Sequence, residues 1–88
     1  MYAKTVTIKN RTGLHARPAS DFVRCAGTFT SRITIGKTGS EDRANAKSIV
    51  MLLSLCLVQG TEVEISAKGD DEQQAVDALA ALVESFED

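Results

Sequence analysis

The sequence has no tryptophan, one proline and one histidine in 88 residues, and its two cysteines are Cys25 and Cys56. The cysteines form no C-x-x-C pair and the single histidine offers no second ligand, so neither a zinc site nor a dithiol redox site is supported. No apolar run approaches the ~20 residues that span a bilayer, and few cysteines favour a reducing compartment. We therefore expect a cytoplasmic protein with no metal, no cofactor and no membrane-inserted segment.

The composition is that of one globular domain over residues 1–88. Hydrophobic residues make up 43% and charged residues 25%, which is too apolar for a disordered chain. The net charge of −2 hides a division, because residues 1–60 hold nine of the ten basic groups and residues 61–88 hold nine of the twelve acidic groups. This division indicates either a solvated acidic helix or a basic surface for an anionic partner. Binding to nucleic acid is disfavoured, because aromatic residues for base stacking are scarce.

The apolar pattern predicts the order β-α-β-β-α-β-α. Alternating residues predict strands at 2–9, 29–35 and 61–67, with a weaker strand at 42–46 and a hairpin turn at 36–40. Apolar spacings of three and four predict helices at 16–26 and 75–86, and residues 49–57 form a third helix that is apolar on most sides. We expect an α+β fold with the helices on one face of an antiparallel sheet.

The single histidine lies in the segment GLHARPA, residues 13–19, where the first strand joins the first helix. Free backbone N–H groups and the helix dipole favour anions at such a helix N-terminus. An imidazole there could carry a phosphoryl group on a ring nitrogen, and the guanidinium of Arg17 could hold the phosphoryl oxygens. The residues alone leave open a plainer interpretation, in which His15 is a surface histidine that caps the helix.

Ser48 begins the apolar helix, and serine is a good N-cap residue. A phosphate on Ser48 would add two negative charges beside an apolar surface. Ile49, Val50 and Leu53 follow on this helix, either as an exposed patch that binds a partner or as part of a small core. For Ser48, a plain cap is the alternative to a regulatory site.

These segments together resemble one known family. Residues 13–19 are similar to the active-site signature of HPr, the histidine-containing phosphocarrier of the bacterial phosphoenolpyruvate-dependent sugar phosphotransferase system. The segments AKSI at 46–49, QGTEV at 59–63 and ISAKGDDE at 65–72 resemble later regions of the same family in the same order. The resemblance spans essentially the whole chain.

The resemblance implies an open-faced β-sandwich of four antiparallel strands covered by three helices. It implies that His15 accepts a phosphoryl group on Nδ1 from Enzyme I and passes it to an EIIA domain of a sugar permease, with Arg17 stabilising the phosphate. Such a protein is a carrier and not an enzyme, and we expect a monomer.

The resemblance also implies regulation at Ser48. In some relatives the matching serine is phosphorylated by an ATP-dependent HPr kinase/phosphorylase, and that form acts through the regulator CcpA in catabolite repression. The loop from Gly36 to Asp42 is about two residues longer than in other members, which moves the serine to position 48. The expected partner-binding residues are Leu14, Ser20, Arg24, Lys47, Ile49, Val50 and Leu53.

Two other functions remain open at this stage. The first is a paralogue with the same His15 chemistry in a regulatory or nitrogen-related phosphorelay. The second is a binding module that acts only through Ser48, which the presence of His15 disfavours because such a module needs no phosphorylatable imidazole.

Overall fold

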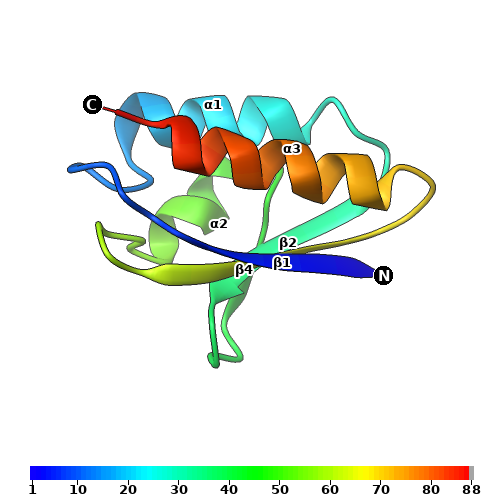
Figure 1. Cartoon of the computed structure of the whole chain (residues 1–88), viewed down its shortest axis with the longest axis horizontal. Helices are drawn as coiled ribbons and strands as arrows, with labels where there is room; N and C mark the ends of the chain where they lie inside the picture. The colour runs from blue at the N-terminus through cyan, green and yellow to red at the C-terminus, as the bar shows by residue number, and fades with distance from the viewer. Residues whose placement is uncertain (88) are drawn as a thin grey trace.

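The computed structural model describes residues 1–87, so Asp88, the end of the expected domain and one of its acidic residues, lies outside the described residues. The elements follow the predicted order (Figure 1). They are β1 (Tyr2–Thr7), α1 (Ala16–Ala26), β2 (Arg32–Lys37), β3 (Arg43–Asn45), α2 (Ile49–Ser54), β4 (Glu62–Lys68) and α3 (Glu72–Ser85).

The four strands form one antiparallel sheet in the order β1-β4-β2-β3. The helices cover one face of this sheet, as Figure 1 shows, and the other face is left uncovered. The α+β open-faced sandwich expected from the sequence is therefore confirmed. Because β4 lies between β1 and β2, the first strand pairs with the last, and β1 and β3 form the two edges of the sheet.

The core lies between the sheet and the helices. Along β4 the side chains of Val63, Ile65 and Ala67 are buried, as the alternating pattern predicted. They face the apolar side of α3, including Leu79, and that of α1, including Phe22, and all five residues belong to one cluster. This burial supplies the main favourable free energy of folding.

The uncovered side of the sheet, the open face, is polar. It carries the outward side chains of alternating strand positions, which include Thr5, Thr34, Glu64 and Ser66. Arg43 lies across this face, where its Nε donates to Thr34 Oγ1 at 3.1 Å and its Nη2 donates to Ser66 Oγ at 3.2 Å. A hydrogen-bonded polar surface can face water, so no helix is needed on this side.

The first strand is fastened to α3 by polar side chains. Asp77 accepts a hydrogen bond from the Tyr2 hydroxyl at 2.9 Å and lies 2.8 Å from Lys4 Nζ. The hydrogen bond from Lys4, and then that from Tyr2, lower the pKa of Asp77. These contacts join β1 to α3. They hold an edge strand whose middle residues are mostly exposed to solvent.

Several predicted boundaries were wrong, and the last helix runs from Glu72 to Ser85 where 75–86 was predicted. The first strand ends at Thr7, although Ile8 still pairs with the chain before β4 through Ile8 N–Thr61 O at 2.9 Å. The second strand begins at Arg32 and not at Phe29, because the Phe29 N–H donates to Ala26 O at the end of α1. The strand then continues to Lys37, so the predicted turn at 36–40 begins two residues later.

The helix predicted over 49–57 also ends early, at Ser54. Cys56 has a φ of 52°, in the left-handed region that ends a right-handed helix. The weak strand expected at 42–46 is present as β3. Within residues 1–87, no helix is long and apolar enough to cross a membrane.

Candidate functional site

His15 occupies the N-cap position of α1, with extended backbone angles of φ −131° and ψ 163°. The side chain is exposed and makes no capping hydrogen bond, so the structure does not support the interpretation of His15 as a side-chain cap. Within residues 1–87, the backbone N–H groups of Ala16 and Arg17 have no hydrogen-bond acceptor. The imidazole is thus presented at a helix end whose first donors are free.

The backbone around His15 is tightly constrained. The Leu14 N–H donates to Leu57 O at 2.9 Å, which joins the loop before α1 to the segment after α2. Gly13 has a φ of +70°, and a Cβ added there would come within 2.3 Å of Leu57 O. Ala16 also has a positive φ, 51°, which costs an L-residue roughly 1–2 kcal/mol. Such a backbone persists only because its surroundings hold it.

The structure corrects the expectation for Leu14. Its side chain is 1% exposed and belongs to the hydrophobic core, so Leu14 does not lie on a surface that contacts partners. The neighbouring His15 is exposed because the backbone is extended there and adjacent side chains point in opposite directions.

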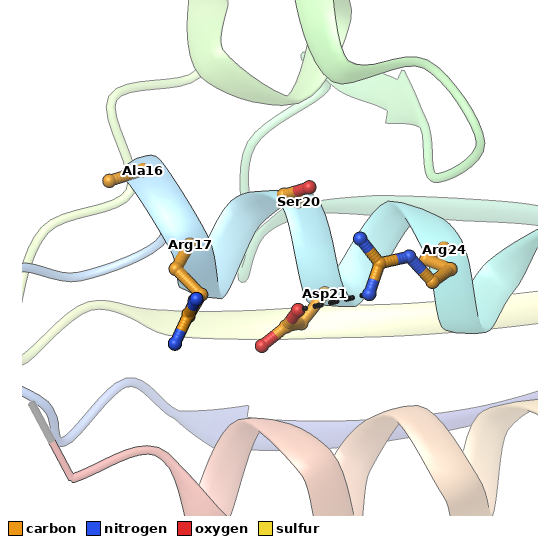
Figure 2. Close-up of a pocket in the computed structure, with 5 residues that line it drawn as sticks. All are labelled: Ala16, Arg17, Ser20, Asp21 and Arg24. Atoms are coloured by element: carbon orange, nitrogen blue, oxygen red, sulfur yellow. Dashed lines mark ion pairs between the residues drawn. The ribbon is translucent and has the colours of Figure 1, made fainter.

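Arg17, Asp21 and Arg24 lie along the same side of α1, as Figure 2 shows. Together with Ala16 and Ser20 they line a shallow hollow of about 370 Å³. Arg24 lies 3.6 Å from Asp21, whereas Arg17 has no ion pair within residues 1–87. The free guanidinium of Arg17, in the first turn of α1, is therefore available to bind an anion beside His15.

Ser48 is the N-cap residue of α2, and its hydroxyl accepts a hydrogen bond from Met51 N at 3.3 Å. The cap predicted from the sequence is therefore present. Ser48 is only half-buried, so the same hydroxyl is within reach of solvent. The Nζ of Lys47 donates to Phe29 O at 2.7 Å, so this cation fastens the segment after α1 to the start of α2.

His15 and Ser48 lie at opposite ends of a pair of helices. The Leu14–Leu57 hydrogen bond joins the start of α1 to the end of α2, and the Lys47–Phe29 hydrogen bond joins the start of α2 to the end of α1. The two helices therefore run in opposite directions.

An apolar surface lies on α2 and just after it, here called the α2 patch. Its members are Ile49, Val50, Met51, Leu53 and Val58, exposed by 38%, 75%, 43%, 37% and 54%. Leu52, by contrast, is 1% exposed, so this helix turns one side chain inward and leaves the others in water. The alternative of complete burial is thus excluded for Ile49, Val50 and Leu53. Exposed apolar clusters of this kind are typical of protein-binding surfaces.

Sequence reasoning missed two members of this patch, Met51 and Val58. The signal for Met51 was present, since residues 49–57 are apolar nearly all round and a six-residue helix can bury only one side. Val58 lies beyond that range. Cys25 and Cys56 are both free, and burial raises the pKa of the Cys25 thiol. In the described part of the chain, no three His, Cys, Asp or Glu side chains are grouped as a metal site would require.

Comparison with known proteins places this arrangement in a class. The family model described as PTS-HPr, the PTS HPr component phosphorylation site, matches residues 2–85. The fold and the exposed histidine segment thus define a phosphocarrier protein. The chain belongs to the HPr family of the phosphotransferase system.

Individual relatives cover nearly all of the chain. It is 49% identical over 87 residues to the phosphocarrier protein HPr of Haemophilus influenzae, with 99% of this chain and 100% of that protein covered. The crystal structure of HPr-C-His from Thermoanaerobacter tengcongensis matches with a TM-score of 0.90 at 49% identity, over 97% of this chain and 93% of the other.

The family also includes relatives with other names. The HPr-like protein Crh of Bacillus subtilis is 46% identical over 84 residues, which are 96% of both chains. The phosphocarrier protein NPr of Proteus mirabilis is 42% identical over 82 residues, or 93% of this chain and 90% of the other. A crystal structure of an HPr dimer from T. tengcongensis matches with a TM-score of 0.75 at 49% identity, over 97% and 95% of the two chains.

Proposed function

We propose that His15 accepts a phosphoryl group on Nδ1 from phosphorylated Enzyme I and passes it to an EIIA domain of a sugar permease. The observation that carries this proposal is the exposed imidazole of His15, which has no hydrogen-bond partner within residues 1–87, at the N-terminus of α1. In the first transfer the lone pair of His15 Nδ1 attacks phosphorus, and the P–N bond forms as the bond to the Enzyme I donor breaks. In the second transfer a nucleophile of the EIIA domain attacks the same phosphorus, and the P–N bond breaks as its electron pair returns to the imidazole nitrogen.

Charge on the transferred group is stabilised by this chain's own donors. The free N–H groups of Ala16 and Arg17 and the positive end of α1 face the phosphoryl oxygens in this proposal. The guanidinium of Arg17 adds a two-pronged donor that no carboxylate within residues 1–87 occupies. These groups act on the charge that develops during transfer.

The protein is a carrier in this account, not an enzyme, because its own histidine is consumed and restored with each transfer. Partners dock on a surface formed by Ser20, Arg24 and Lys47 together with the α2 patch, to which Ile49, Val50 and Leu53 contribute. Transient transfer needs modest contact areas and attraction between opposite charges. The exposed α2 patch and the basic side chains of Arg17 and Arg24 on α1 support such docking.

Ser48 is the proposed regulatory site, phosphorylated by an ATP-dependent HPr kinase/phosphorylase and recognised in that form by CcpA. Its half-buried hydroxyl at the start of α2 supports this role. A phosphate there would place two negative charges beside Ile49 and Val50, which an apolar partner surface would reject. One surface would then serve transfer in one state and regulation in the other.

A second function is favoured by the relative named phosphocarrier protein NPr, at 42% identity. In it, His15 serves a regulatory or nitrogen-related phosphorelay in place of the sugar branch. The His15 chemistry is the same, so purified Enzyme I of each branch distinguishes the two by rate.

We further infer that residues 1–88 form one cytoplasmic domain that is a monomer in solution, although an HPr dimer and a swapped Crh dimer are known. Sedimentation at several concentrations tests the oligomeric state.

For the function itself, the protein is incubated with phosphoenolpyruvate and Enzyme I, and separately with ATP and the kinase, and the modified residue is mapped by mass spectrometry. Phosphate on His15 in the first reaction, lost in His15→Ala, is the expected result, and labelling that persists in His15→Ala would overturn the proposal.

A further inference from the structure

Asn10 is a buried polar residue in the loop that leads to His15. Its side chain is 4% exposed, and only Ser31 shares this character among the buried residues of the described chain. Burying an amide is unfavourable unless its polar atoms are paired. The bonds that Asn10 makes therefore indicate what its burial achieves.

Both backbone polar groups of Gly13 are held by Asn10. The Asn10 Nδ2 donates to Gly13 O at 2.8 Å, and the Gly13 N–H donates to Asn10 O at 3.2 Å. Gly13 is two residues before His15, and its left-handed backbone lies against Leu57 O and Val58 Cα, where a Cβ would clash. The loop is thus fixed from one side by Asn10 and from the other by the segment after α2.

This arrangement also destabilises the fold at one atom of the Asn10 side chain. The Asn10 Oδ1 is buried and accepts no hydrogen bond within residues 1–87. A buried unpaired acceptor destabilises a fold by roughly 1–3 kcal/mol. An apolar residue of the same size would avoid this loss, but it would leave Gly13 O without its donor.

The imidazole of His15 has no partner of its own in the described chain, so its position depends on the backbone that carries it. Three hydrogen bonds fix that backbone immediately upstream: Asn10 Nδ2 to Gly13 O, Gly13 N to Asn10 O, and Leu14 N to Leu57 O. Phosphoryl transfer between two proteins demands alignment of the attacking nitrogen to within a fraction of an ångström.

We propose that Asn10 is a positioning residue for His15: its buried amide fixes the Gly13 carbonyl and so holds the imidazole in place for phosphoryl transfer. This role rests on the proposed function. Asn10 touches neither the phosphoryl group nor a partner, and it acts only through the loop.

The test uses two variants of Asn10 in the full chain. Asn10→Ala removes the amide, and Asn10→Leu removes it while filling the same space and eliminating the unpaired Oδ1. Both should lower kcat for phosphorylation by Enzyme I on the order of tenfold and leave KM little changed, because alignment is lost and the docking surface is intact. Ser31→Ala is the matched control, since it also removes a buried polar group but lies outside the His15 loop.

Amide hydrogen exchange gives a readout that does not depend on activity. In both Asn10 variants the Leu14 amide should exchange about tenfold faster relative to the Ile65 amide in β4, because the Leu14–Leu57 hydrogen bond opens locally. In Ser31→Ala the exchange rates of the Leu14 and Ile65 amides should change by the same factor.

Each outcome decides one point. Unchanged kcat in both folded Asn10 variants overturns the positioning role, as does a rise in exchange shared equally by Leu14 and Ile65. If wild-type protein is not phosphorylated at all, the proposed function fails, and the exchange ratio alone then decides whether Asn10 holds the loop. If one Asn10 variant fails to fold, the kcat and exchange ratio of the other variant decide the test. Asn10→Leu preserves the side-chain volume, and Asn10→Ala introduces no larger side chain, so the two variants differ in how they could disturb the fold.

Discussion

Ser31 and Asp71 lie forty residues apart in the chain and are joined by two hydrogen bonds to one carboxylate oxygen. The Ser31 N–H donates to Asp71 Oδ1 at 3.0 Å, and the Ser31 hydroxyl donates to the same atom. Thr30 binds the other oxygen through its N–H at 2.9 Å. The carboxylate at the start of α3 thus fixes the chain that enters β2, and these donors, the Ser31 hydroxyl first, lower the pKa of Asp71 to about 2.

Acid should therefore weaken the fold through Asp71. Since its pKa is lowered from 3.8, the carboxylate stabilises the folded state above about pH 4, and this contribution is lost as the pH falls towards 2. Asp71→Asn should lower the urea midpoint at pH 6 and flatten its decline between pH 4 and 2. The exposed Asp70→Asn, one residue away, should retain the wild-type profile, and identical profiles for all three proteins would contradict this account.

Arg17→Ala should slow phosphorylation of His15 on the order of 100-fold in kcat, because a donor to the developing charge is lost. Arg24→Ala is the comparison, since Arg24 pairs with Asp21 farther along α1 and should raise KM alone. Steady-state transfer from Enzyme I measures both. Circular dichroism should show both variants folded, and an unfolded Arg17→Ala would assign the residue a structural role.

Substitutions on α2 should affect partner binding and folding stability separately, according to whether the side chain belongs to the exposed α2 patch or to the core. Val50 is 75% exposed, so Val50→Ser should change the free energy of unfolding by less than about 0.5 kcal/mol yet weaken binding to EIIA. Leu52 is buried, and Leu52→Ala should cost about 2–5 kcal/mol of stability. Urea unfolding and titration calorimetry measure the two effects. Unaltered EIIA affinity in Val50→Ser would remove Val50 from the docking surface.

Substitutions at Ser48 should distinguish the loss of its N-cap hydrogen bond from the effect of a negative charge added at the same position. Ser48→Ala should lower the free energy of unfolding by about 1 kcal/mol, because Met51 N loses its acceptor. Ser48→Asp can still cap α2 and should be nearly as stable as the wild type, while its added charge weakens transfer from Enzyme I. Thermal unfolding and transfer rates test this, and equal stability of all three proteins would show that the Ser48 cap contributes nothing.

Docking with Enzyme I should slow as salt is added. Arg17 and Arg24 lie together on α1, whereas most acidic groups lie in residues 61–88, so a protein of net charge −2 has a locally positive side. Screening weakens attraction between exposed charges beyond about 10 Å at 0.1 M salt. Stopped-flow association rates should fall with ionic strength in the wild type and less in Arg17→Gln/Arg24→Gln. A wild-type rate that does not depend on salt would contradict this prediction.

Periodic patterns predicted the regular elements well and their ends poorly. The helix at 16–26 and the inward positions of β4 followed directly from residue spacing, because each element buries one side. The end of α2 depends on the left-handed Cys56, and the start of β2 depends on distant Asp71, which binds Thr30. Neither is a local pattern.

The residues of the candidate site also differ in how well the sequence predicted their positions. The segment at 13–19 placed His15 and Arg17 together at the start of α1, as the structure does. Leu14 was expected to contact partners because of the family resemblance, but it is buried where its N–H donates to Leu57 O in the segment after α2. Asn10 gave no signal, since a polar residue before a turn usually faces water, and only the folded loop shows its amide buried against Gly13.

The uncovered side of the sheet has a practical use. Thr5 in β1 pairs with Glu64 of β4 and precedes the buried Val6, so its side chain lies on the polar open face and not on the side of the sheet that the helices cover. A fluorophore or surface tether attached there after Thr5→Cys would stand on the far side of the molecule from the docking residues. The free Cys25 and Cys56 would first be replaced by serine, so that the label reports encounters with partners without obstructing them.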